Sequence, residues 1–232
     1  MNATWMGMWL CAAALVSSST AVAMSTPSEE LDQALRLKPH LAHGAEIFET
    51  CAACHGPDGH GAPDGSVPAI AGQPIAVIAK EIVEFRYDSR LNVRMQHFVD
   101  RHHLTAPQQL ADVAAYVSSL PPRHPPPAQE TPQSRRGARL FAESCASCHG
   151  PMGEANASAR VPRLAGQYPE YLAEQLHDAA EGRRPGMGRD HMRVLARLSS
   201  DDLDAIAQYL TGIDPRSGTP DRARKPPYRT AP

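Results

Sequence analysis

The feature that most constrains this chain is an internal repeat. Three pairs of similar segments stand about 93 residues apart, namely 44–56 and 137–150, 67–73 and 161–167, and 111–116 and 203–209. A repeat of that length is the size of a whole domain, whereas solenoid proteins repeat every 20–50 residues or so. We therefore expect two tandem copies of one domain, produced by duplication.

Other segments flank and separate the two copies. Residues 121–134 are rich in proline, which favours extended polyproline II and predicts a semi-rigid linker between domains at 24–120 and 135–213. Residues 214–232 are rich in proline and arginine and show no apolar periodicity. That composition predicts a disordered basic tail.

The first 23 residues have the pattern of an export signal. An apolar run from Trp9 to Val16 precedes small residues and then Ala21-Val22-Ala23, an A-x-A cleavage pattern. The run is shorter than the roughly 20 apolar residues that span a bilayer. Because no lysine or arginine precedes the run, an uncleaved N-terminal anchor is the alternative. We expect a signal peptide over residues 1–23 and a periplasmic location.

Each copy is predicted to be all-α, in the order helix, long loop, helix, loop, helix. The last helix gives the clearest pattern, because Thr105 to Gln108 matches a capping box and Ser199 to Asp202 offers a similar start. Apolar residues then follow at helical spacing in both copies. They are Leu110, Val113, Ala114, Val117 and Leu120 in the first, and Leu203, Ile206, Ala207, Leu210 and Ile213 in the second.

Neither copy has the composition of a self-sufficient small core. Aromatic residues make up 5% of the chain, and both tryptophans, Trp5 and Trp9, lie within the export signal. A domain of roughly 80 residues rarely buries enough apolar surface without a cross-link or a prosthetic group. We therefore expect a large apolar group in each core.

A C-x-x-C-H motif in each copy identifies that group. Residues 51–55 read Cys-Ala-Ala-Cys-His, and residues 145–149 read Cys-Ala-Ser-Cys-His. This is the pattern of covalent haem attachment, in which two thiols one helical turn apart bond to the two vinyl groups of one haem. The adjacent histidine then supplies an axial nitrogen to the iron. The sequence predicts two haem c groups, bound through Cys51, Cys54, Cys145 and Cys148 and ligated by His55 and His149.

Three other uses of these cysteines are weaker. A thioredoxin-like pair needs no following histidine and belongs near a βαβ pattern. A zinc site would bring both motifs into one cluster, whereas here each motif lies in its own copy. Simple disulfides are compatible with an exported protein. A chance C-x-x-C-H at matching positions of a duplication is improbable.

Residues 40–213 resemble class I cytochromes c, and their tandem arrangement is similar to the dihaem cytochrome c4 family. Besides the two motifs, the resemblance rests on the Pro-x-Ile/Leu-Ala-Gly-Gln segments and on residues 167–184. It implies that the backbone carbonyls of Pro68 and Pro162 hold the proximal histidines and that Ile70 and Leu164 pack on the haems. Copy one departs from this pattern at two places. It has Val77 where copy two has Tyr171, and it has Glu81-Ile82 where copy two has Gln175-Leu176.

The same resemblance implies a methionine as the sixth iron ligand, in the loop before the last helix. Met95 is the candidate in copy one, and Met192 is preferred to Met187 in copy two. The rivals of Met95 are His97, His102 and His103. The remaining histidines are expected at the surface, namely His40, His43, His60, His124, His177 and His191. Methionine ligation raises the reduction potential, a second histidine would lower it, and an open iron would admit peroxide.

The charge distribution bears on the partners. The formal net charge is −2, so no strongly basic domain suggests nucleic acid. Residues 24–120 carry −5, residues 134–213 carry zero and the tail carries +3. Such polarity can steer docking to a larger redox protein, and the basic tail could also contact anionic lipid at the membrane periphery.

The sequence therefore predicts a monomeric electron carrier and not an enzyme. The resemblance implies transfer from a membrane quinol-oxidising complex towards a terminal oxidase. The alternatives are the cytochrome subunit of a dehydrogenase and a dihaem enzyme, peroxidase-like or thiosulfate-oxidising, with one haem lacking methionine.

Overall fold

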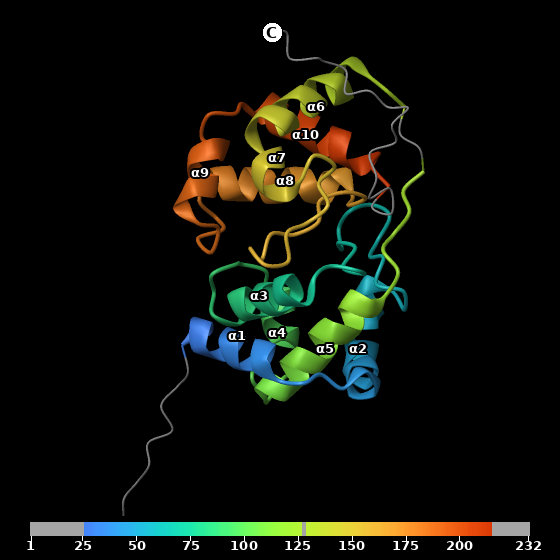
Figure 1. The fold of residues 1–232 in the computed structure, drawn as a ribbon, viewed down its shortest axis with the longest axis vertical. Coiled ribbons are helices and arrows are strands. Elements are labelled where there is room, and N and C mark those ends of the chain that lie inside the picture. The colour runs from blue at the N-terminus through green and yellow to red at the C-terminus, as the bar shows by residue number, and fades with distance from the viewer. Residues whose placement is uncertain (1–25, 127–128, 215–232) are drawn as a thin grey trace, which may run out of the picture.

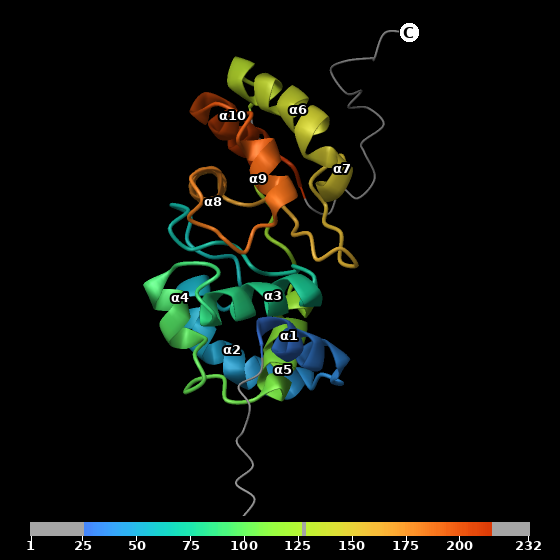
Figure 2. The ribbon, with the colours of Figure 1, turned by 90° about the vertical axis from the view of Figure 1, so that its left-hand side faces the viewer.

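The computed structural model describes residues 26–126 and 129–214, which form two helical lobes stacked along the long axis (Figures 1 and 2). Within these residues the only β-type pairing is an isolated bridge between Asn156 and Val161. The predicted all-α class is confirmed. The expected signal peptide and the expected basic tail, apart from Asp214, lie outside the described residues.

The first lobe contains five helices: α1 (Pro27–Arg36), α2 (Leu41–His55), α3 (Ile75–Arg86), α4 (Val93–Phe98) and α5 (Pro107–Ser119). The second lobe repeats the last four: α6 (Pro132–Ser144) with α7 (Ala146–His149), α8 (Pro169–Ala180), α9 (Arg189–Leu195) and α10 (Ser200–Thr211). The loops expected before the last helices therefore contain the short helices α4 and α9. Because α6 begins at Pro132, the last residues of the expected linker are helical.

In each lobe the first and last helices of the repeat cross at a glycine. Gly44 of α2 lies against the backbone of Asp112, where an added Cβ would be 2.2 Å from the carbonyl oxygen. Gly137 of α6 lies against Ala205, where the same distance would be 1.8 Å. Only a residue without a side chain permits so close a crossing. Both copies therefore have the same helix–helix contact.

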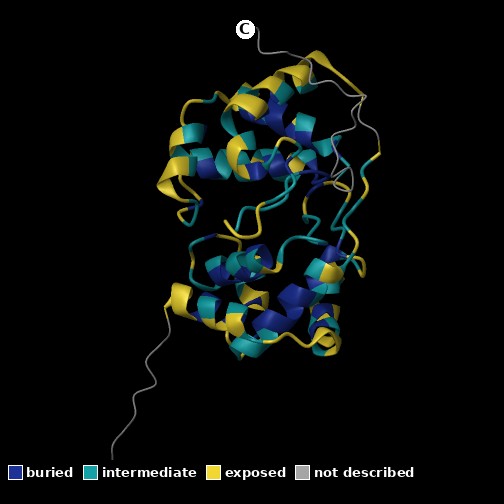
Figure 3. Ribbon diagram, in the orientation of Figure 1, coloured by how far each residue is buried: buried dark blue, intermediate teal, exposed yellow. Residues whose placement is uncertain are grey.

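An aromatic pair lies beside each crossing. The rings of Phe48 and Tyr116 are 5.4 Å apart in the first lobe, and those of Phe141 and Tyr209 are 5.7 Å apart in the second. Both distances are in the range of favourable aromatic contacts. Figure 3 shows that the buried residues concentrate on the inner faces of the helices, α5 and α10 among them.

The predicted apolar face of the last helix is buried in both copies, apart from Leu120, which is half-buried. The predicted start of α10 is also correct, because Ser199 and Asp202 form a reciprocal capping box. The predicted start of α5 is one residue too early, because the N-cap is Ala106 and not Thr105. Its cap uses Gln109, whose Oε1 accepts from the backbone N–H of Thr105 at 2.7 Å, while Gln108 donates to Asp112.

Helix α1 is an addition to copy one that the repeat does not predict. Its Glu30 is 1% exposed and forms ion pairs with Arg86 and Arg101, and it accepts a hydrogen bond from the Tyr87 hydroxyl at 2.9 Å. A buried carboxylate needs such partners to offset its desolvation. These contacts tie α1 to α3 and to the segment before α5.

A group of ionic and polar side chains joins the two lobes. Arg90 forms a buried ion pair with Glu81 and donates to Tyr171 and Gln175 of the other lobe. Arg184, its counterpart in the repeat, contacts the same Glu81 at 3.3 Å. Copy one therefore has glutamate in place of glutamine because one carboxylate faces two arginines at the interface. The departure of Glu81 from the family pattern is therefore explained by the contact between the two domains.

Candidate haem sites

The first motif lies at the C-terminal end of α2. Gly56 ends the helix with a φ of +76°, so the chain turns away directly after His55. The His55 ring is buried, and its Nδ1 lies 3.0 Å from the carbonyl oxygen of Pro68. Cys51 is half-buried and Cys54 is exposed.

The second motif reproduces this arrangement. The chain breaks between α6 and α7 at Cys145, and Gly150 ends α7 with a φ of +79°. His149 is 8% exposed, and its Nδ1 lies 3.1 Å from the carbonyl oxygen of Pro162. Cys148 is exposed. The two sites agree to within 0.1 Å in the histidine contact.

Each carbonyl fixes the protonation of its histidine. A carbonyl oxygen can only accept, so Nδ1 carries the proton and Nε2 is left free to bind a metal. Burial lowers the pKa of both His55 and His149, against the smaller opposing effect of these hydrogen bonds. Both rings are therefore neutral near pH 7, as ligation requires.

The other uses of the cysteines do not fit this geometry. None of the four described cysteines forms a disulfide, and the two motifs lie in different lobes. Burial raises the pKa of Cys51 and raises that of Cys145 to about 11, which disfavours the thiolate that zinc binding or thiol exchange needs. Ile70 packs against the same core cluster of the first lobe as Cys51, and Leu164 packs against the same core cluster of the second lobe as Cys145.

Comparison with known proteins gives the same result. The cytochrome c family model matches residues 41–121 and again residues 134–214. Cytochrome c4 of Azotobacter vinelandii is 34% identical over 190 residues, covering 74% of this chain and 88% of that protein. This chain belongs to the dihaem cytochrome c4 family. Its two C-x-x-C-H motifs each bind one covalent haem c, and it is an electron-transfer cytochrome.

Two further matches refine the picture of this dihaem cytochrome. The crystal structure of reduced recombinant cytochrome c4 from Pseudomonas stutzeri is 29% identical with a TM-score of 0.68, covering 76% of this chain and 100% of that one. A thiosulfate dehydrogenase electron acceptor of Stutzerimonas stutzeri strain A1501 is 31% identical over 198 residues, covering 77% of this chain and 90% of that protein.

The candidates for the sixth ligand occupy different environments. Met95 is half-buried on α4 and packs against the first core, as Cys51 and Ile70 do. Its rivals His97, His102 and His103 are exposed, and the His97 and His103 rings are 4.7 Å apart. Together with Asp100, His97 and His103 form the one cluster of three potential metal ligands found among the described residues.

In the second domain the candidates lie on or beside α9. Met187 packs against a small cluster that includes Leu195, and Met192 is half-buried. The expectation that His191 is a surface residue is wrong. Its ring is half-buried, and the pKa of His191 is lowered to about 4 by burial and by the nearby His149, Arg184 and Lys80.

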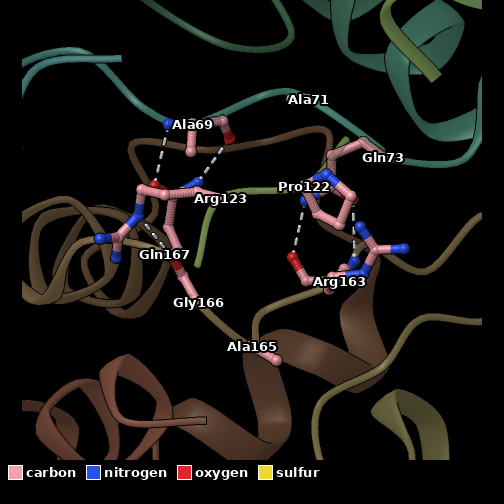
Figure 4. A pocket seen from close by; sticks show the side chains of 9 residues that line it. All are labelled: Ala69, Ala71, Gln73, Pro122, Arg123, Arg163, Ala165, Gly166 and Gln167. Atoms are coloured by element: carbon pink, nitrogen blue, oxygen red, sulfur yellow. Dashed lines mark hydrogen bonds between the residues drawn. The ribbon is translucent and has the colours of Figure 1, made fainter. Parts of the chain in front are cut away.

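A crossed pair of glutamines joins the two haem sites of the cytochrome (Figure 4). Gln167 accepts from the backbone N–H of Ala69 at 3.0 Å and donates to the carbonyl of the same residue at 2.8 Å. Gln73 makes the equivalent contacts with Arg163, at 2.9 and 2.7 Å. Each glutamine therefore completes the hydrogen bonding of the loop that holds the other domain's proximal histidine.

In each domain a single peptide group links the proximal histidine to the glutamine of the other domain. The Pro68 carbonyl accepts from His55, and the N–H of the same Pro68–Ala69 peptide donates to Gln167. Hydrogen bonds arranged in a chain polarise one another. The strength of the bond to His55 thus depends on a side chain of the second domain.

We expect Gln167→Leu to raise the potential of the first haem while leaving the second unchanged. The Pro68 carbonyl becomes a weaker acceptor, so the imidazole is less anionic and the ferric state less stabilised. A change of 10–30% in the strength of a hydrogen bond worth about 1 kcal/mol corresponds to a shift of roughly 5–15 mV in the reduction potential of the haem. Spectroelectrochemical titration measures the two potentials. Gln73→Leu is the matched control, and a shift confined to the first haem in both variants would contradict the crossed connection.

Proposed function

We propose that this dihaem cytochrome is exported to the periplasm and carries electrons singly between redox proteins. The donor is a quinol-oxidising complex or a dehydrogenase, and the acceptor is a terminal oxidase. The observation that carries this proposal is the pair of matching sites joined by the crossed glutamines. Among the described residues no helix is long and apolar enough to cross a membrane.

The protein's own residues favour electron transfer by holding the iron ligands in place while the iron changes between its ferric and ferrous states. The haems supply one-electron chemistry through the ferric and ferrous states of their iron. Pro68 and Pro162 orient the two histidines. Met95 and Met192, both half-buried, are our proposed sixth ligands of the first and second irons. The exposure of Cys54 and Cys148 supports docking of partners near the attached edge of each haem.

A specific observation favours a second candidate role, that of electron acceptor for a thiosulfate-oxidising dehydrogenase. The relative from Stutzerimonas stutzeri has that name and matches both domains of this chain. In this role the cytochrome takes electrons from a catalytic partner and does not oxidise thiosulfate itself. The two roles differ in the protein that donates electrons to the cytochrome. In both roles the cytochrome accepts the electrons at its haems in the same way.

The test follows the ferric holoprotein by its visible spectrum with one donor at a time. A carrier is expected to remain oxidised with thiosulfate alone and to show no turnover of hydrogen peroxide. It is expected to become reduced by a quinol-oxidising complex with quinol, or by a thiosulfate dehydrogenase with thiosulfate, at rates that fall with ionic strength. Reduction by thiosulfate alone would instead make the protein an enzyme. A dihaem peroxidase would reveal itself by peroxide turnover.

A further inference from the structure

Two histidines and an aspartate lie together at the end of α4 and on the turn that follows it. His97, Asp100 and His103 each offer one ligand atom, and these three atoms lie within 4.8 Å of one another. The side chains are accessible to solvent at the outer edge of the first lobe (Figure 2). The proposed electron-transfer function does not use them, because the candidate iron ligand on α4 is Met95.

The distances between these side chains are close to those around a single metal ion. The Nδ1 atom of His103 lies 2.9 Å from Oδ1 of Asp100, and the ring centres of His97 and His103 are 4.7 Å apart. Nitrogen and oxygen ligands bind zinc at about 2.0–2.2 Å, so neighbouring ligand atoms lie about 3–3.5 Å apart. A modest rotation of the exposed His97 side chain therefore completes the set.

The turn that carries these residues is held firmly against the first domain. Arg86 of α3 donates to the backbone carbonyls of Val99 at 2.8 Å and Leu104 at 3.0 Å, one at each end of the turn. The Asp100 carboxylate accepts from the backbone N–H groups two and three residues later, at 2.8 and 3.1 Å. Because this turn is already ordered, a ligand bound there costs little further conformational entropy.

The neighbouring side chains also favour a bound cation. The ring of Phe98 lies 5.2 Å from that of His97 and 6.0 Å from that of His103, so an apolar group lies beside both histidines. An apolar surrounding lowers the local dielectric constant and strengthens the bonds to an ion. Arg101 lies within the turn, but it forms an ion pair with Glu30 of α1 at 2.8 Å and so has a carboxylate partner of its own.

We propose that His97, Asp100 and His103 bind one divalent transition-metal ion, in addition to the two haem irons. Imidazole nitrogens suit zinc, copper and nickel, whereas calcium and magnesium prefer sites made of oxygen atoms. Three protein ligands leave a coordination position for water. The bound ion cross-links the end of α4 to the turn before α5, and so stabilises the segment that carries Met95.

The test titrates zinc into the purified holoprotein and follows binding by isothermal titration calorimetry. Zinc is chosen because it has no redox chemistry and leaves the oxidation state of the haem irons unchanged. One zinc ion is expected to bind tightly per chain. The variants His97→Gln, His103→Gln and Asp100→Asn are each expected to weaken this binding at least about tenfold. Asparagine keeps an oxygen that accepts from the turn but removes the charge.

His177→Gln is the matched control. His177 also contacts a carboxylate, that of Asp204 at 2.9 Å, but no third potential ligand joins this pair in the part of the chain that the structure describes. This variant is expected to bind zinc as tightly as the unaltered protein does.

Two results would overturn the proposal. One is the absence of a tight zinc site in the unaltered protein, and the other is equal zinc affinity in the control and in the three variants of the cluster. Haem content of two per chain shows that each variant has folded. Zinc binding is measured without any electron donor or acceptor, so its failure and the failure of the carrier function are distinguishable.

Discussion

Replacing Cys145 and Cys148 together by alanine is expected to give a protein with one haem and an unfolded second domain. The buried core of this domain consists of one cluster of seven residues and another of three, whereas the first domain has a single cluster of fourteen. A core this small supplies at most about 3–5 kcal/mol. Without the haem, the free energy of unfolding of the second domain is expected to fall to near zero.

Haem absorbance per chain and limited proteolysis measure this outcome. The absorbance is expected to fall by half, and the cleavage sites that are new relative to the unaltered protein are expected only within residues 135–213. Ser147→Ala is the matched control, because this exposed serine lies between the two cysteines and should leave both haems in place. A second domain that resists protease without its haem would contradict the argument. The reciprocal variant, with Cys51 and Cys54 replaced, should retain more structure because of the larger core.

The variant Gly137→Ala is expected to destabilise the second domain strongly while leaving the haem motif intact. The new Cβ would lie 1.8 Å from the Ala205 carbonyl oxygen, so α6 and α10 would have to separate. Overpacking of this kind costs about 1–3 kcal/mol, and more where backbone atoms are in the way. Thermal or denaturant unfolding of the holoprotein, followed at the haem bands, measures the loss.

Gly188→Ala is the control for this substitution. A Cβ at Gly188 meets nothing within 4 Å, and the residue has a φ of −49°. Its expected cost is below about 1 kcal/mol, mainly from a poorer helix cap. Equal unfolding midpoints for the two variants would show that the helices do not cross closely at Gly137.

The features that depend on the spacing of residues along the chain could be predicted from the sequence. The two motifs and the apolar face of the last helix follow from residues a few positions apart, the duplication follows from segments that recur after about 93 residues, and the fold confirms all three. Helix α1 could have been found the same way, since Thr26 and Glu29 form a capping box before Leu31, Ala34 and Leu35. It was missed because copy two has no counterpart.

Features that depend on tertiary contacts could not be read from the sequence. The repeated Gln73 and Gln167 were visible, but their exchange between domains appears only when the loops face each other. The sequence shows Glu81 only as a departure from the family pattern, whereas the fold shows that it forms ion pairs with Arg90 and Arg184. The sequence likewise predicts His191 at the surface, and only the fold shows that its ring lies near His149.

The crossed glutamines also bear on how the protein is made. A chain emerges from synthesis N-terminus first, so the first domain can fold before the second exists. At that stage the N–H and carbonyl of Ala69 and the amide of Gln73 have only water as partners, because their partners lie at residues 163–167. The surroundings of the first proximal histidine are therefore complete only after the C-terminal half of the chain has arrived.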